Sequence, residues 1–184
     1  MEIKLIITDF DGTLVNTFQA NYHAYREAFE QMGLSLSEDT YRECYGLRFD
    51  GFMDKVGIVD DEVRRSIRSI KGECYPDYFG LLHVNQPLLD MIRMFRQGGG
   101  LTAVASTARG KNLNNALGHI GAKDDFDLIL AGEDVKEGKP SPEIYNNVMQ
   151  RMGVTPAETL IFEDSPVGLQ AAQAAGAHYI KINL

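Results

Sequence analysis

The stretch IKLIITDFDGT at residues 3–13 decides the fold of this protein. It begins with a short, mostly apolar run that contains three isoleucines, and Asp and Gly then interrupt the run. An apolar run of this length followed by turn residues is typical of a buried β-strand. The strand is expected to place two carboxylates, Asp9 and Asp11, just past its carboxyl end.

The residues from about 17 to 79 follow a different pattern. Aromatic and apolar side chains recur there at helical spacing, at Phe18, Tyr22, Tyr25, Phe29 and Met32. Further on, Asp60 precedes a segment that is acidic at its start and basic later, the pattern of a helix capped by Asp60. No part of the stretch has the pattern of a strand. We therefore predict a small all-helical cap domain at residues 15–83, inserted after strand one.

Beyond Pro87, predicted helices and strands alternate strictly. Strands are expected at 101–106, 127–131, 159–162 and 178–182, and the helices lie between them. Ser165 and Pro166 stand where the N-cap and the first residue of one of these helices belong. Such alternation predicts an α/β core, a Rossmann-like parallel sheet with helices on both faces, formed by residues 1–14 and 84–184.

Composition limits the function classes. The chain has 184 residues, a hydrophobic share of 44%, a formal net charge of −8 and a sequence pI of about 5.0. A nucleic-acid-binding surface or a polybasic membrane patch needs clustered Lys and Arg, so we expect neither partner. No apolar stretch approaches the roughly 18 residues that span a bilayer, and the N-terminus does not have the pattern of a signal peptide. We expect a cytoplasmic monomer.

Polar side chains follow the predicted strands. In open parallel sheets, ligands bind outside the carboxyl ends of the strands, so residues at these positions are expected to converge. Most of the candidates come directly after a strand, and one stands in the loop GKPSPE: Asp9, Asp11, Ser106, Thr107, Lys139, Glu163 and Asp164.

This set has a coherent chemistry. Clustered carboxylates repel each other unless a cation lies among them, and hard oxygen ligands suit Mg²⁺. One carboxylate can attack phosphorus and form an aspartyl-phosphate, and a second acid can move the protons. A lysine and a hydroxyl can hold the oxygens of the transferring phosphoryl group.

Four segments carry a family resemblance: DFDGTLVNT, VASTA, GKPSPEIY and IFEDSPVGLQAAQAAG. They resemble, in order, the four motifs of the haloacid dehalogenase superfamily, in the helical-cap branch of phosphoglycolate phosphatase-like enzymes and β-phosphoglucomutase. The resemblance implies that Asp9 is the nucleophile and Asp11 the general acid/base. It implies that Asp9, the backbone carbonyl of Asp11 and Asp164 hold Mg²⁺, with Glu163 as a ligand or a neighbour of the ligands. It also implies that Ser106 and Lys139 bind the phosphoryl group. Thr107, the next residue after Ser106, is the alternative hydroxyl.

We therefore expect a Mg²⁺-dependent phosphatase acting on a small phosphorylated metabolite. A β-phosphoglucomutase-type mutase would use the same intermediate and is the alternative. A dehalogenase is disfavoured because it needs neither a metal nor a second acid such as Asp11. A signalling receiver domain is disfavoured because receivers are shorter and have no helical insertion after strand one. Arg48 and Arg109 are the candidates for contacting the rest of an anionic substrate.

Overall fold

The computed structural model describes residues 2–184, which divide into two compact units. An α/β unit contains the residues up to Asn16 and from His83 to Leu184, and a helical unit contains Thr17–Leu82. Each unit has a hydrophobic cluster of its own.

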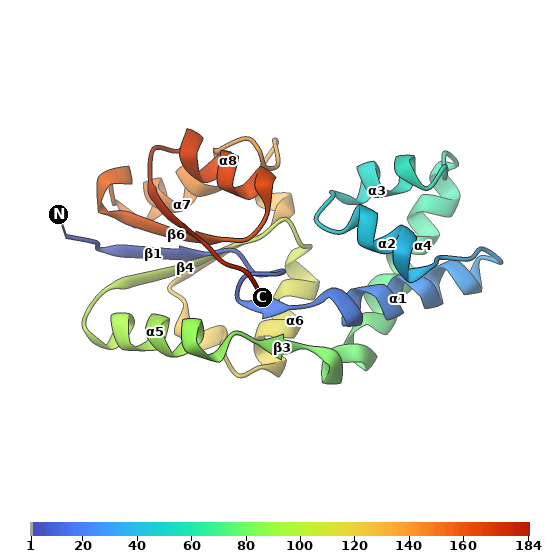
Figure 1. Ribbon diagram of the computed structural model, residues 1–184, viewed down its shortest axis with the longest axis horizontal. Helices are drawn as coiled ribbons and strands as arrows, with labels where there is room; N and C mark the ends of the chain where they lie inside the picture. Colours follow the sequence, from blue (N-terminus) through green and yellow to red (C-terminus); the bar gives the residue numbers. More distant parts are fainter. Residues whose placement is uncertain (1) are drawn as a thin grey trace. The chain divides into compact units, whose positions relative to one another are not determined.

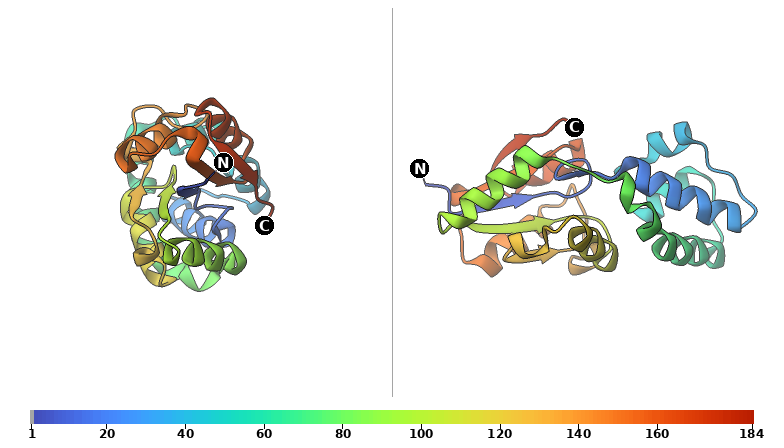
Figure 2. Two further views of the ribbon diagram at one scale, coloured as in Figure 1. Left: turned by 90° about the vertical axis from the view of Figure 1, so that its left-hand side faces the viewer. Right: turned by 90° about the horizontal axis from the view of Figure 1, so that it is seen from below.

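The α/β unit is built on a five-stranded sheet in which every pair of neighbouring strands is parallel. The strand order is β5-β4-β1-β6-β7. The bounds are Leu5–Thr8 for β1, Leu101–Ala105 for β4, Leu128–Leu130 for β5, Thr159–Glu163 for β6 and His178–Lys181 for β7. Because β1 lies in the centre, the residues that follow it lie between those that follow β4 and β6. The chain enters this sheet at the central strand β1 and leaves it at the edge strand β7 (Figure 2).

Helices cover both faces of this sheet (Figure 1). Helices α5 (Gln86–Gln97) and α6 (Gly110–His119) lie on one face, and α7 (Glu143–Met152) and α8 (Pro166–Ala174) lie on the other. Leu5 and Ile7, which share one face of β1, are buried in the cluster that α7 and α8 complete. The predicted fold class is confirmed, and Ser165 accepts the predicted N-cap hydrogen bond, from the Gly168 N–H.

Several short elements have no clear sequence pattern. Strands β2 (Val15–Asn16) and β3 (His83–Val84) pair antiparallel in a sheet of their own. Two residues are too few to show the alternation by which strands are recognised, and the sequence analysis missed both. Three single-turn helices complete this unit: η2 (Lys123–Asp125), η3 (Gly132–Asp134) and η4 (Pro156–Glu158).

The helical unit consists of α1 (Phe18–Gln31), α2 (Glu38–Cys44), α3 (Phe49–Lys55), α4 (Asp61–Cys74) and the 3₁₀ segment η1 (Tyr75–Leu81). As predicted, Asp60 caps α4: its carboxylate accepts the backbone N–H groups of Glu62 and Val63. The aromatic stripe of α1 contributes Tyr22 and Phe29 to a cluster that also buries Phe52 and Ile67 from α3 and α4.

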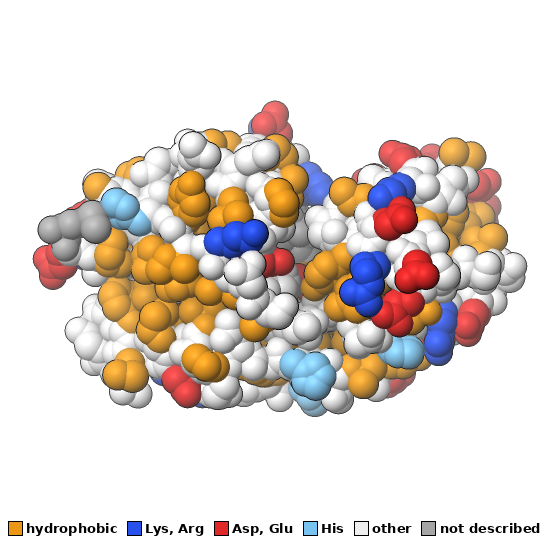
Figure 3. Space-filling view, in the orientation of Figure 1, with side chains coloured by type: hydrophobic (Ala, Val, Ile, Leu, Met, Phe, Trp, Pro, Cys, Tyr) orange, Lys and Arg blue, Asp and Glu red, His pale blue; other side chains and the backbone are white. Residues whose placement is uncertain are grey.

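The surface of the helical unit is charged and mixed in sign. Acidic and basic side chains lie beside each other on the face drawn in Figure 3. Exposed ion pairs such as Arg42–Glu38 and Arg68–Asp50 account for part of this mixture, and pairs of this kind contribute little to stability. Over residues 2–184, no helix combines the length and the apolar character needed to cross a bilayer.

Candidate active site

The carboxyl ends of β1, β4 and β6 bring several of the predicted residues together. The Asp9 N–H donates to the Phe162 carbonyl of β6 at 2.9 Å, and the Ser106 N–H donates to the Leu130 carbonyl of β5 at 3.0 Å. These bonds extend the sheet ladder by one residue past the strands. They fix the backbone of Asp9 and Ser106 on the rigid part of the fold, which is where a site needs its groups.

A buried ion-pair cluster around Lys139 lies at this edge. The Lys139 ammonium donates to Asp9 Oδ1 at 2.7 Å, to Glu163 Oε1 at 2.6 Å and to the Ala105 carbonyl at 3.2 Å. The Lys139, Asp9 and Glu163 side chains are only 3%, 9% and 1% exposed. A buried charge is tolerated only when it is paired and hydrogen-bonded, and here all three ammonium hydrogens have an acceptor.

Burial and charge shift the titration of this cluster. Burial raises the pKa of Asp9 well above its ordinary value, against the attraction of Lys139, and the neighbouring Glu163 charge acts in the same direction as burial. Burial alone would lower the pKa of Lys139, but the Asp9 and Glu163 charges hold that pKa well above its ordinary value. Both carboxylates thus favour the charged form of Lys139, and one oxygen of Asp9 is bound to it.

Asp11 and Ser106 are also neighbours. Ser106 Oγ donates to Asp11 Oδ2 across a long 3.5 Å and accepts the Ala108 N–H at 3.0 Å. Ser106 is fully buried, whereas Asp11 is half-buried. The Ser106 hydroxyl is thus oriented by the backbone of its own loop. The Asp11 side chain remains partly exposed to solvent.

Asp164 is held against the turn that follows β1. Thr13 Oγ1 donates to Asp164 Oδ1 at 2.9 Å. Gly12 has a φ of 87°, and a Cβ at this position would overlap the Asp164 carboxylate. Burial raises the pKa of Asp164, and the Glu163 charge adds to this shift. Gly12 therefore serves both a left-handed turn and the close approach of Asp164.

Glu163 is surrounded by hydrogen-bond donors. Its Oε1 accepts from Lys139 and from the Tyr145 hydroxyl, the latter at 3.1 Å. Its Oε2 accepts the Ser165 N–H at 2.9 Å and the Ser165 hydroxyl at 3.1 Å. These four bonds engage both oxygens of a fully buried carboxylate. They fix the position of Glu163, which in turn binds the Lys139 ammonium.

The space for Glu163 depends on Gly168. A Cβ at Gly168, on the first turns of α8, would overlap the Glu163 carboxylate. We expect Gly168→Ala to destabilise the protein by about 2–3 kcal/mol, because the carboxylate has no room to move away. The measurement is urea unfolding, followed by circular dichroism.

Gly118→Ala is the matched control for this substitution. Gly118 is also helical, but a Cβ there meets nothing within 4 Å. Alanine at this position should raise the free energy of unfolding by about 0.5–1 kcal/mol. Equal effects of the two alanines would contradict the packing described around Glu163.

The remaining predicted residues lie elsewhere. Thr107 is half-buried in the loop between β4 and α6. Its backbone carbonyl lies so close to Gly132 that a Cβ on residue 132 would overlap it. Arg109 is exposed at the N-cap position of α6. Arg48 is exposed at the N-cap position of α3 and belongs to the helical unit.

Sequence reasoning missed two side chains of the cluster, Thr13 and Tyr145. Thr13 belongs to the quoted DFDGT segment, so its proximity to Asp11 was a usable signal. Tyr145 follows Lys139 by six residues, and nothing in their sequence spacing indicates that both reach Glu163. Each is buried and bonded to a carboxylate of the set.

The donor set fits a hard divalent cation. Asp9, Asp11, Glu163 and Asp164 are four carboxylates near one edge, and Lys139 is the cation paired with two of them. Within residues 2–184, no group of three or more His, Cys, Asp or Glu side chains is arranged so that these side chains alone could hold a metal ion. Mg²⁺ commonly binds through one or two carboxylates, together with waters and substrate phosphate, so the residues present suit it.

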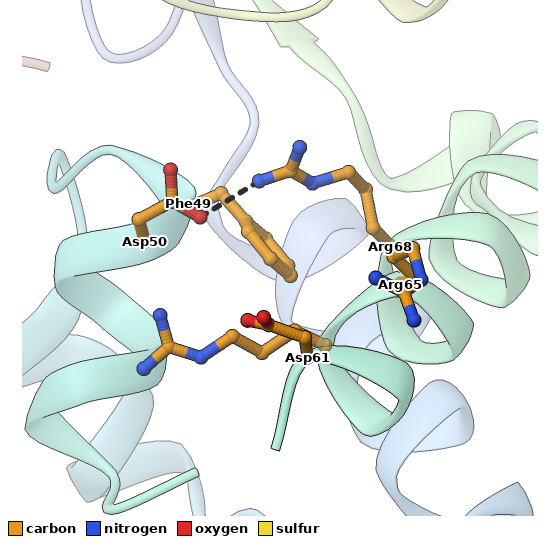
Figure 4. Close-up of a pocket in the computed structure, with 6 residues that line it drawn as sticks. Phe49, Asp50, Asp61, Arg65 and Arg68 are labelled. Atoms are coloured by element: carbon orange, nitrogen blue, oxygen red, sulfur yellow. Dashed lines mark hydrogen bonds and ion pairs between the residues drawn. The ribbon is translucent and has the colours of Figure 1, made fainter. Parts of the chain in front are cut away.

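The helical unit has a pocket of its own, between α3 and α4 (Figure 4). Its volume is about 300 Å³, and it is lined by Phe49, Asp50, Asp61, Arg64, Arg65 and Arg68. Arg68 is paired with Asp50 at 2.9 Å and Arg64 is paired with Asp54. Because two of the three arginines are already neutralised, this pocket does not have the excess charge of an anion site.

Comparison with known proteins identifies relatives along nearly the whole chain. The profile of the haloacid dehalogenase-like hydrolases matches residues 6–182. The phosphorylated carbohydrates phosphatase of Thermotoga maritima is 28% identical over 97% of this chain and 84% of its own length. Protein CbbY of Rhodobacter capsulatus is 30% identical over 98% of this chain and 85% of its own length.

Solved structures agree with these sequence matches. CbbY from Rhodobacter sphaeroides, in complex with phosphate or with xylulose-(1,5)bisphosphate, superposes with a TM-score of 0.90 at 27% identity. The alignments cover 99% of this chain and 87% of that one. The resemblance predicted from the four motifs is confirmed, and so is the predicted enzyme class, a hydrolase whose named relatives include phosphatases.

Proposed function

This chain belongs to the haloacid dehalogenase-like hydrolase family, and we propose that it is a Mg²⁺-dependent phosphatase acting on a small phosphorylated carbohydrate through an aspartyl-phosphate. The observation that carries the proposal is the Asp9–Lys139 pair, a nearly buried carboxylate with one oxygen bound to a cation at the carboxyl edge of the sheet. The substrate class is supported by the name of the Thermotoga maritima relative.

In the first half-reaction, an oxygen of Asp9 attacks phosphorus. The new bond joins this oxygen to phosphorus, and the bond between phosphorus and the sugar oxygen breaks. Lys139 holds Asp9 Oδ1, so Oδ2 is the oxygen left for the attack. Asp11 donates a proton to the departing sugar oxygen, a contribution of about 10²–10⁴-fold in rate.

The second half-reaction reverses these roles. Water attacks the phosphorus of the aspartyl-phosphate while Asp11 takes one of its protons, and the Asp9–phosphorus bond breaks to release inorganic phosphate. Ser106, whose hydroxyl is oriented by Ala108, binds an oxygen of the phosphoryl group in both steps. Thr107 is the alternative hydroxyl for this contact.

Asp9, Asp164 and the backbone carbonyl of Asp11 are the groups that would hold Mg²⁺. When bound, the ion supplies positive charge that offsets the carboxylates and the incoming phosphate. Glu163 is better suited to anchoring Lys139 than to binding the metal, because both its oxygens already accept two hydrogen bonds. Arg48 and Arg109 are proposed to contact the rest of the substrate.

A panel of phosphate esters tests this function. With Mg²⁺ present, we expect steady release of inorganic phosphate, with the largest kcat/KM on a sugar phosphate, and loss of release when EDTA removes the metal. The same assay separates the alternative of a mutase. Isomerised sugar phosphate with little free phosphate would contradict the proposed hydrolysis.

A further inference from the structure

Tyr145 is a buried residue of the α/β unit that the proposed mechanism does not use. It lies near the start of α7 and is fully buried. Its hydroxyl donates to Glu163 Oε1 at 3.1 Å, and the centre of its ring lies 5.0 Å from the Lys139 ammonium. Burying a hydroxyl costs free energy unless it is hydrogen-bonded. The bond to Glu163 offsets this cost for the Tyr145 hydroxyl.

The hydrogen bonds form one continuous chain. Tyr145 donates to Glu163, Glu163 accepts from Lys139, and Lys139 donates to Asp9. Neither the ammonium of Lys139 nor the carboxylate of Glu163 has much freedom left, since every ammonium hydrogen and both carboxylate oxygens are engaged. Networks of this kind restrict the groups they hold when every member is satisfied.

We infer that Tyr145 is a positioning residue: its hydroxyl, together with Ser165, fixes Glu163, and Glu163 in turn holds Lys139 on Asp9. The catalytic consequence of this inference rests on the function proposed above. Glu163 Oε1 accepts one hydrogen bond from Tyr145 and one from Lys139. Without the Tyr145 hydroxyl, only the bond from Lys139 remains. One oxygen of the carboxylate is then less firmly fixed, and so is the Lys139 ammonium that it holds beside the nucleophile.

The experiment is Tyr145→Phe, assayed with p-nitrophenyl phosphate and excess Mg²⁺. Phenylalanine keeps the ring and its packing and removes the hydroxyl alone. We expect kcat to fall about tenfold while KM stays within about twofold, because small displacements of a charge-stabilising group affect the transition state more than binding. Tyr78→Phe is the matched control, since the Tyr78 hydroxyl donates to the Glu27 carboxylate at 2.8 Å in the helical unit. Its kcat should equal that of the wild type.

A double-mutant cycle tests whether Tyr145 acts through Glu163. In the background of Glu163→Gln, adding Tyr145→Phe should change kcat by less than about twofold, because the group on which Tyr145 acts is already altered. A tenfold loss in both backgrounds would show that Tyr145 acts independently of Glu163 and would overturn the inference.

A chemical readout makes the test independent of turnover. Lys139 should resist acetylation by acetic anhydride in the folded wild type and should react faster in Tyr145→Phe, as followed by peptide mass spectrometry. If the wild type releases phosphate from no ester, the proposed function fails, whereas this labelling still decides the positioning role. Unchanged labelling and unchanged kcat in Tyr145→Phe would refute that role.

Ser165→Ala keeps the inference testable should Tyr145→Phe fail to fold. It removes the hydroxyl donor from the other oxygen of Glu163, at a half-buried position. The same faster labelling of Lys139 is expected. Labelling at the wild-type rate would overturn the inference.

Discussion

Replacing Asp9 by Asn is expected to lower the rate of phosphate release by about 10⁴-fold, because an amide does not attack phosphorus. The substitution is nearly isosteric, and Lys139 keeps its bonds to Glu163 and to the Ala105 carbonyl. The fold should therefore persist. The measurement is initial-rate phosphate release in excess Mg²⁺, together with thermal unfolding of the variant.

Asp90→Asn is the control for this prediction. Asp90 is an exposed carboxylate on α5 of the same unit. Its loss should leave the rate within about twofold of the wild type. An Asp9→Asn variant with the full wild-type rate would show that the proposed nucleophile is wrong.

Replacing Lys139 by Met is expected to abolish turnover and also to destabilise the fold by about 3–5 kcal/mol. The substitution removes the shared cation of two buried carboxylates, and breaking a buried pair from one side leaves an uncompensated charge. Burial already raises the pKa of Asp9 against the attraction of Lys139, so removing this cation should raise the pKa of Asp9 in the folded protein further. Urea unfolding of wild type and variant at two pH values measures the destabilisation and its pH dependence, and phosphate release measures the loss of turnover.

The sign of the pH dependence follows from this raised pKa of Asp9. A carboxyl with a raised pKa binds its proton more readily in the folded state, so stability falls as the pH rises. The destabilisation by Lys139→Met should thus be larger at pH 8 than at pH 5. Lys123→Met, at an exposed lysine in η2, should have a small effect that does not change with pH. A pH-independent loss for Lys139→Met would contradict the charge argument.

The predicted sheet and its covering helices agree closely with the structure, and the reason is local. Each long element has a pattern that can be read in a window of ten residues or fewer, such as the apolar run before Asp9 or the capping residues Asp60 and Ser165. Strands β2 and β3 were missed because two-residue strands have no such pattern and depend on each other for pairing. Their existence is a consequence of the fold around them.

The candidate site was predicted as a set of residues but without its contacts. Strand ends share one edge in a parallel sheet, so the sequence alone is enough to group Asp9, Ser106 and Asp164. The role of Glu163 could not be assigned in this way. A residue after a strand can face the metal side or the core side, and only packing against Gly168 and Tyr145 decides which.

The sequence by itself determined the fold class, the family and the chemical types gathered at the edge of the sheet. These follow from periodicity, capping residues and four motifs, all of which act over short stretches of chain. Only the tertiary structure decided that Lys139 binds Asp9 and Glu163 together, and that Tyr145 completes the network. The bonded residues lie up to 130 positions apart in the chain, so their contacts depend on how helices and strands pack and not on any local pattern.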